Sequence, residues 1–160
     1  MTGRLATLTG DFLAQSPLRH GPFRVFYAGA IAAALGYTMQ TTVAAGLMAT
    51  LTPSAVMVAL VQTASTAPAL LFGLFAGAMA DIVDRRKVIV ATQVVLVAAS
   101  ALLGVAAIAG WVGPAMLLAM TFVVGAGFAF YQPAQQASVN DLVARAEMPQ
   151  AVSLNAVGFN

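Results

Sequence analysis

One short stretch of this sequence combines acidic and basic side chains closely enough to do chemistry. Residues 77–87 read GAMADIVDRRK and hold two acids beside three bases, namely Asp81, Asp84, Arg85, Arg86 and Lys87. A carboxylate in such a place can pair with a guanidinium group or cap the positive end of a helix, each contact being worth about 0.3–2 kcal/mol depending on burial. Contacts this weak can form and break, so the stretch is a candidate for a reversible gate.

Uncharged polar side chains also recur at helical spacing. Tyr37, Gln40 and Thr41 stand at i, i+3 and i+4, and Gln62, Ser65 and Thr66 repeat that spacing, so each set lies on one helix face. Such faces either line a polar cavity or hydrogen-bond neighbouring helices, and the sequence allows both. The candidate residues of a substrate cavity are Tyr37, Gln40, Thr41, Gln62, Thr66, Phe128 and Gln132.

Motifs for catalysis are absent from the sequence. It has no Cys and one His, so it offers no multi-residue metal site, and it contains neither GxxxxGK[ST] nor HExxH. The GxG at Gly125 and Gly127 lies in an apolar run without the strand or third glycine that dinucleotide binding needs. We therefore predict no enzyme, no metal and no cofactor.

Composition places these residues in a membrane. The 160 residues are 61% hydrophobic and 8% charged, whereas soluble domains are about 25% charged. The net charge of +2 comes from cations too dispersed to track phosphates, so we expect the lipid bilayer rather than nucleic acid as partner.

The charges fall in three clusters, separated by the uncharged stretches 25–80 and 88–140. A 56-residue helix would be about 84 Å long, against about 30 Å for the hydrocarbon core, so each stretch must cross and return. Breaks near Pro53 and at Gly113 and Pro114 predict an all-α integral membrane fold with helices at about 25–48, 54–78, 88–109 and 115–137. Residues 1–22 are predicted to be a cytoplasmic leader and residues 23–160 a partial helical bundle. The fifth helix of this bundle is expected to start at about 149–160.

Two details refine these helices. Pro68 should bend the second helix near its middle, and the glycine pairs Gly73/Gly77 and Gly125/Gly127 predict close helix packing. An even number of crossings puts all basic clusters on one side, which is cytoplasmic because Lys and Arg remain inside. We expect a multi-pass protein of the inner (plasma) membrane with a cytoplasmic N-terminus and no cleavable signal.

The charged stretch resembles the signature of the major facilitator superfamily, approximately G-x-L-A-D-R-x-G-R-[RK]. Matching positions are Gly77, Ala80, Asp81, Arg85 and Arg86, and departures occur at Met79, Ile82 and Asp84. The chain is also similar to the branch of transmembrane secretion effectors, or enterobactin-exporter-like permeases, through Ser16, Pro17, Leu18, Arg19, Phe23, Arg24, Leu51, Thr52, Ser54, Pro133, Ala134, Ala137, Leu142, Val143, Arg145, Leu154 and Asn155.

That resemblance implies a twelve-helix fold of two six-helix halves around a central cavity. The chain would hold about four and a half N-terminal helices, with the missing C-terminal helices as partners. The first and fourth helices would line the cavity, and Asp81, supported by Arg85, would latch the cytoplasmic side.

The predicted function is therefore a secondary transporter, an antiporter that exports a small amphipathic drug or siderophore using the proton gradient, present as an incomplete chain. The alternative is a small four-helix membrane subunit or assembly factor without transport activity. A small multidrug transporter fits less well, because its membrane-embedded Glu in the first helix is missing.

Overall fold

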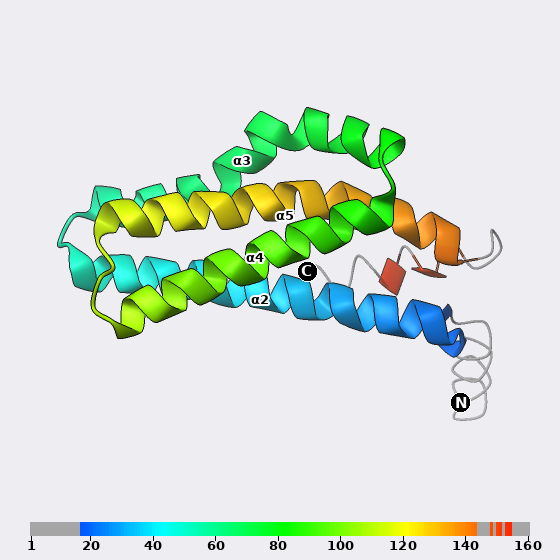
Figure 1. Cartoon of the computed structure of the whole chain (residues 1–160), viewed down its shortest axis with the longest axis horizontal. Coiled ribbons are helices and arrows are strands. Elements are labelled where there is room, and N and C mark those ends of the chain that lie inside the picture. The colour runs from blue at the N-terminus through cyan, green and yellow to red at the C-terminus, as the bar shows by residue number, and fades with distance from the viewer. Residues whose placement is uncertain (1–16, 144–147, 149, 152, 155–160) are drawn as a thin grey trace, which may run out of the picture. The chain divides into compact units, whose positions relative to one another are not determined.

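The computed structural model describes residues 17–143 together with residues 148, 150, 151, 153 and 154. A short 3-10 helix, η1 (Pro17–Arg19), precedes four long α-helices, which are α2 (Gly21–Leu51), α3 (Ala55–Ile82), α4 (Arg85–Ile108) and α5 (Pro114–Leu142) (Figure 1). The described part contains no strand. The predicted all-α fold is confirmed.

The helices extend past the uncharged stretches from which their limits were predicted. α2 begins at Gly21 rather than near residue 25, with Pro22 in the first turn, where its missing N–H costs nothing. α5 continues to Leu142 rather than ending near residue 137. The predicted leader and the predicted fifth helix at about 149–160 fall largely outside the described residues, although residues 150, 151, 153 and 154 are helical.

Three of the described helices are long and apolar enough to cross a membrane: Ala55–Ile82, Arg85–Ile108 and Pro114–Val139. α2, the first of four predicted spans, is not among them. Its 31 residues suffice in length, but the polar run Tyr37, Thr38, Gln40, Thr41 and Thr42 lowers its hydropathy. The chain is thus a multi-pass membrane protein whose first long helix, α2, is less apolar than its three candidate spans.

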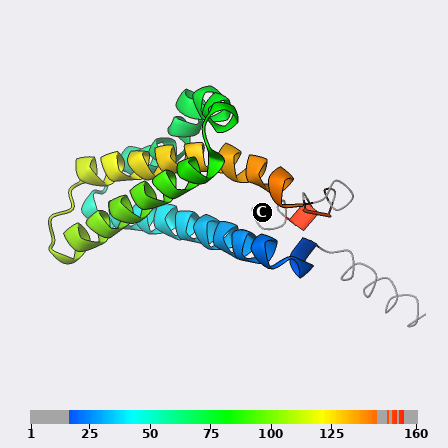
Figure 2. The same cartoon turned by 45° about the vertical axis from the view of Figure 1, so that its right-hand side comes forward.

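Residues 35–135 form one compact unit in which all four helices meet. Its core joins Ala44 and Met48 of α2 to Val61 of α3, Leu103 of α4 and Leu117 of α5. Figures 1 and 2 show α5 running between α3 and α4, and show α3 changing direction along its length, as Pro68 predicts.

Residues 1–34 and 136–160 belong to a second unit. Its described core consists of Phe23, Val139, Val143 and Ala151. Phe23 stacks on Tyr27 with ring centroids 6.0 Å apart, and the Tyr27 hydroxyl donates to the Leu154 carbonyl at 2.8 Å. The start of α2 is therefore tied to the segment that follows α5.

The two glycine pairs have different roles. A Cβ on Gly125 would lie 2.5 Å from the Ser65 carbonyl oxygen, and one on Gly127 would lie 3.2 Å from the Leu96 side chain, so α5 packs closely on α3 and α4. A Cβ on Gly73 or Gly77 would meet nothing within 4 Å. Close packing is confirmed for Gly125 and Gly127, whereas no described residue packs closely on the Gly73/Gly77 pair.

We predict that Gly125→Ala lowers stability by about 1–3 kcal/mol, because the new methyl group meets backbone atoms that cannot move aside. Gly73→Ala is the matched control and should be neutral or stabilising by up to about 1 kcal/mol, since alanine favours helix. The thermal unfolding temperature of the purified protein in detergent measures both. Equal losses for the two variants would contradict this packing.

Candidate functional site

Of the two acidic residues in the turn between α3 and α4, Asp84 has a clear structural role. α3 ends at Ile82, and the extended backbone of the next residue, Val83 (φ −97°, ψ 149°), leaves the helix. Asp84 then caps α4, its carboxylate accepting from the Arg86 backbone N–H at 3.0 Å. α4 opens with the three bases Arg85, Arg86 and Lys87, which lie unfavourably at the positive end of the helix dipole. Asp84 offsets that charge, so its role is local and structural.

Asp81 has no comparable role in its own helix. It is exposed in the last turn of α3, where the negative end of the helix dipole disfavours a carboxylate. Gly77 lies one turn earlier and is half-buried, whereas Arg86 is exposed and Arg85 half-buried. The turn therefore presents a carboxylate that costs α3 free energy, next to a capped, strongly basic helix start.

Three helices meet around the Tyr37 ring. Tyr37 of α2 stacks on Phe128 of α5, with centroids 4.1 Å apart and planes 4° from parallel. Its hydroxyl donates to the Ser65 carbonyl of α3 at 3.0 Å. Phe128 also contacts Tyr131, with centroids 5.7 Å apart. The two predicted cavity residues Tyr37 and Phe128 are thus brought together, in direct contact with each other.

At this junction α2 and α5 contact backbone carbonyl groups of α3 directly. Pro68 has no N–H to donate to the carbonyl of Ala64, four residues earlier. Gly125 approaches from α5, where a Cβ would lie 3.2 Å from the Ala64 carbonyl oxygen. Glycine at this position lets α5 come close to the bend, while the Tyr37 hydroxyl bonds to the adjoining carbonyl of Ser65.

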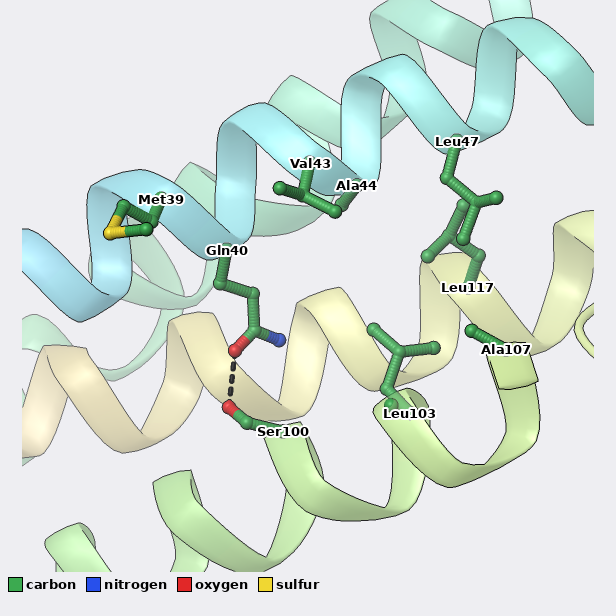
Figure 3. Close-up of a pocket in the computed structure, with 10 residues that line it drawn as sticks. Met39, Gln40, Val43, Ala44, Leu47, Ser100, Leu103, Ala107 and Leu117 are labelled. Carbon is green, nitrogen blue, oxygen red and sulfur yellow. Dashed lines mark hydrogen bonds between the residues drawn. The ribbon is translucent and has the colours of Figure 1, made fainter.

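Gln40 turns to a different neighbour. Its side-chain oxygen accepts a hydrogen bond from the Ser100 hydroxyl of α4. The two residues line a pocket between α2 and α4, to which α5 contributes Leu117 (Figure 3). Tyr37 and Gln40, predicted on one face of α2, therefore contact separate helices.

The other predicted cavity residues form local contacts or lie exposed. Thr41 is half-buried and its hydroxyl donates to the Thr38 carbonyl at 3.0 Å. Gln62 and Thr66 are exposed, and the Thr66 hydroxyl donates to the Gln62 carbonyl at 2.9 Å. Gln132 is half-buried on α5. The structure does not gather these side chains with Tyr37 into one site.

Two contacting residues were missed in the sequence. Ser100 is the only polar residue between residues 94 and 108, and this isolation in an apolar helix is the signal that could have marked it. Tyr131 is buried one turn after Phe128, and its helical spacing from that aromatic residue was a weaker signal. No group of three or more His, Asp or Glu residues that could hold a metal ion occurs in the described part of the chain.

The described helices define a multi-pass membrane protein. The family model for transmembrane secretion effectors, within the major facilitator superfamily, matches residues 13–160. The chain belongs to that family. Neither the curated proteins nor the solved structures gave a match.

We predict that Asp84→Ala lowers stability by about 0.5–2 kcal/mol, since it removes the cap of α4. Asp84→Asn retains a capping oxygen and should stay close to the parent protein. Asp81→Asn removes a charge from the unfavourable end of α3 and should cost nothing. Thermal unfolding in detergent provides the comparison, and a loss for Asp81→Asn as large as that for Asp84→Ala would refute these separate roles.

Proposed function

We propose that these helices work as the N-terminal part of a twelve-helix exporter that moves a small amphipathic molecule, such as a drug or siderophore, out of the cell. Membership of the family supports membrane transport as the class of function. The description of the family as secretion effectors favours transport out of the cell. A siderophore is proposed as a substrate because the sequence resembles the enterobactin-exporter-like branch.

The observation that carries the proposal is the position of Asp81. A carboxylate that is exposed, destabilises its own helix end and leaves capping to Asp84 is explained best by a partner that it meets in only one state of the protein. In an alternating-access cycle this partner would close the cytoplasmic side, with Arg85 supporting the carboxylate. The contact is weak enough to break in each cycle.

The polar middle of α2 supports a pathway for an amphipathic substrate. Tyr37 and Phe128 give an aromatic surface on α2 and α5, and Gln40, Thr41 and Gln132 lie half-buried within about two turns of it along these helices. Gln62 and Thr66 on α3 are exposed polar candidates. A helix too polar to pass as a simple span is what a water-accessible pathway requires.

Topology and energy coupling complete the proposal. With α2 also crossing, four crossings put the N-terminus and the α3–α4 turn in the cytoplasm, beneath the plasma (inner) membrane. Residues 25–80 and 88–140 carry no Asp, Glu, Lys, Arg or His. Proton coupling would therefore use groups outside these two stretches.

We predict that Asp81→Asn in the full-length protein slows efflux by about fivefold or more while membrane abundance is unchanged, because a state-dependent contact of about 1–2 kcal/mol is lost. Asp84→Asn, which retains the cap, is the matched control and should transport normally. Efflux of a lipophilic fluorescent cation and of an iron-chelating siderophore is followed in cells, and a protonophore should stop it.

Two outcomes would count against this proposal. Parallel loss of abundance and efflux in Asp81→Asn would make the turn purely structural. No efflux of any substrate by the parent protein would favour the alternative, a four-helix membrane subunit or assembly factor, for which the uncovered Gly73/Gly77 face of α3 offers a contact surface.

A further inference from the structure

One face of α4 is apolar and exposed along the half of the helix that follows the α3–α4 turn. Val90, Val94 and Val97 lie on this face and are 55%, 62% and 68% exposed. Half of a hydrocarbon core of about 30 Å corresponds to about ten helical residues, so these valines lie in the membrane leaflet next to the turn. The neighbour that such a face requires there is a lipid chain.

Two bases stand at the head of this face. Arg86 and Lys87 are both exposed. Successive residues of an α-helix differ by about 100° in direction, so the three valines project between the two bases, at about 20–80° from Arg86 toward Lys87. The valine stripe (Val90, Val94 and Val97) is therefore flanked by a positive charge on each side where it reaches the membrane surface.

These two charges have no counter-charge in the described part of the chain. Neither side chain forms a hydrogen bond or ion pair with a described residue. Both bases lie at the positive end of the α4 dipole, and the one carboxylate of Asp84 can offset only part of their charge. The backbone N–H groups of Arg86 and Lys87 are already bonded to Asp84, so the side chains are the groups left to bind an anion.

We propose that Arg86 and Lys87 bind the phosphate of an anionic phospholipid, such as phosphatidylglycerol, whose acyl chain lies along the valine stripe. The Arg86 guanidinium can donate to two phosphate oxygens at once, and the flexible Lys87 side chain can reach the same group from the other side. A choline headgroup would bring a further positive charge to these two bases, so an anionic lipid is preferred. The proposal concerns a lipid and stands apart from the proposed export function.

An exposed face of α3 provides an internal comparison with the opposite charge. Leu70 and Leu74 are 88% and 85% exposed. Asp81 follows Leu74 by seven residues and lies within about 20° of the same direction. An exposed acid therefore stands at the head of this apolar face. Lipid chains can lie on the face, but an anionic headgroup would be repelled there.

The test uses two photoreactive phospholipids with the purified full-length protein in nanodiscs of phosphatidylcholine. One probe has the anionic phosphatidylglycerol headgroup and the other the zwitterionic phosphatidylcholine headgroup, and both have the same diazirine-bearing acyl chain. Mass spectrometry maps and quantifies the labelled residues. We expect the anionic probe to label residues 90–97 at least about fivefold more, the ratio that one base near the membrane surface supplies.

Three further readouts in the parent protein follow from the same contact. Excess unlabelled phosphatidylglycerol should compete for residues 90–97. Added salt should reduce the preference, because the two bases are exposed. Residues 70–75 of α3 should show no preference for the anionic probe. These readouts test the contact without any variant.

Variants separate a specific headgroup contact from the general charge of the protein. Arg86→Gln combined with Lys87→Gln leaves the valine stripe intact, so both probes should label residues 90–97 equally. Arg24→Gln is the matched control, because Arg24 is another exposed base in the first turn of a helix but lies on α2, outside the proposed site. Its loss should leave the preference at residues 90–97 unchanged. The thermal unfolding temperature shows whether each variant remains folded.

Three results would overturn the proposal. Equal labelling of residues 90–97 by both probes in the parent protein would show that the stripe accepts any lipid chain. Absence of labelling there would show that another part of the protein covers the stripe. A preference that survives the double variant, or that is lost to the same extent in Arg24→Gln, would place its source outside Arg86 and Lys87.

Discussion

A polar side chain in lipid must find its partner inside the protein, and this constraint organises the described helices around α2. Tyr37 donates to the Ser65 carbonyl of α3, and Gln40 accepts from Ser100 of α4. Thr41 and Thr42 both donate to the Thr38 carbonyl within α2 itself. Because the two interhelical bonds lie at partly buried helix contacts, they fix both the rotation and the height of α2 against its neighbours.

The close approach of α5 to α3 complements that arrangement. Pro68 bends α3 and takes a donor from the Ala64 carbonyl, and Gly125 lets the α5 backbone move in against the same turn. Phe128, one turn later on α5, then reaches the Tyr37 ring. The bend, the glycine and the aromatic stack are therefore parts of one junction, placed in the middle of the proposed substrate pathway.

Much of the fold and turn could be predicted from local pattern. The all-α architecture followed from long uncharged stretches, and the bend in α3 from Pro68. Partner choice could not be predicted, because residues three apart on a helix differ by about 60° in direction and 4.5 Å in height. Tyr37 and Gln40 thus share a face yet contact α3 and α4 separately. Closely spaced glycines likewise permit a close helix contact without requiring one. Only the tertiary structure shows that another helix packs against Gly125 and that none of the described helices packs against Gly73.

The central claim is that the polar residues of α2 hold specific neighbouring helices in register, and cysteine cross-linking in native membranes tests it most directly. The 160-residue sequence contains no Cys, so a pair of introduced cysteines in an otherwise cysteine-free protein can be read without background. Gln40→Cys with Ser100→Cys should cross-link efficiently with a short bifunctional thiol reagent. Thr42→Cys with Ser100→Cys, which places one thiol on the exposed side of α2, should not. Equal cross-linking of both pairs, or none for Gln40 with Ser100, would contradict the account.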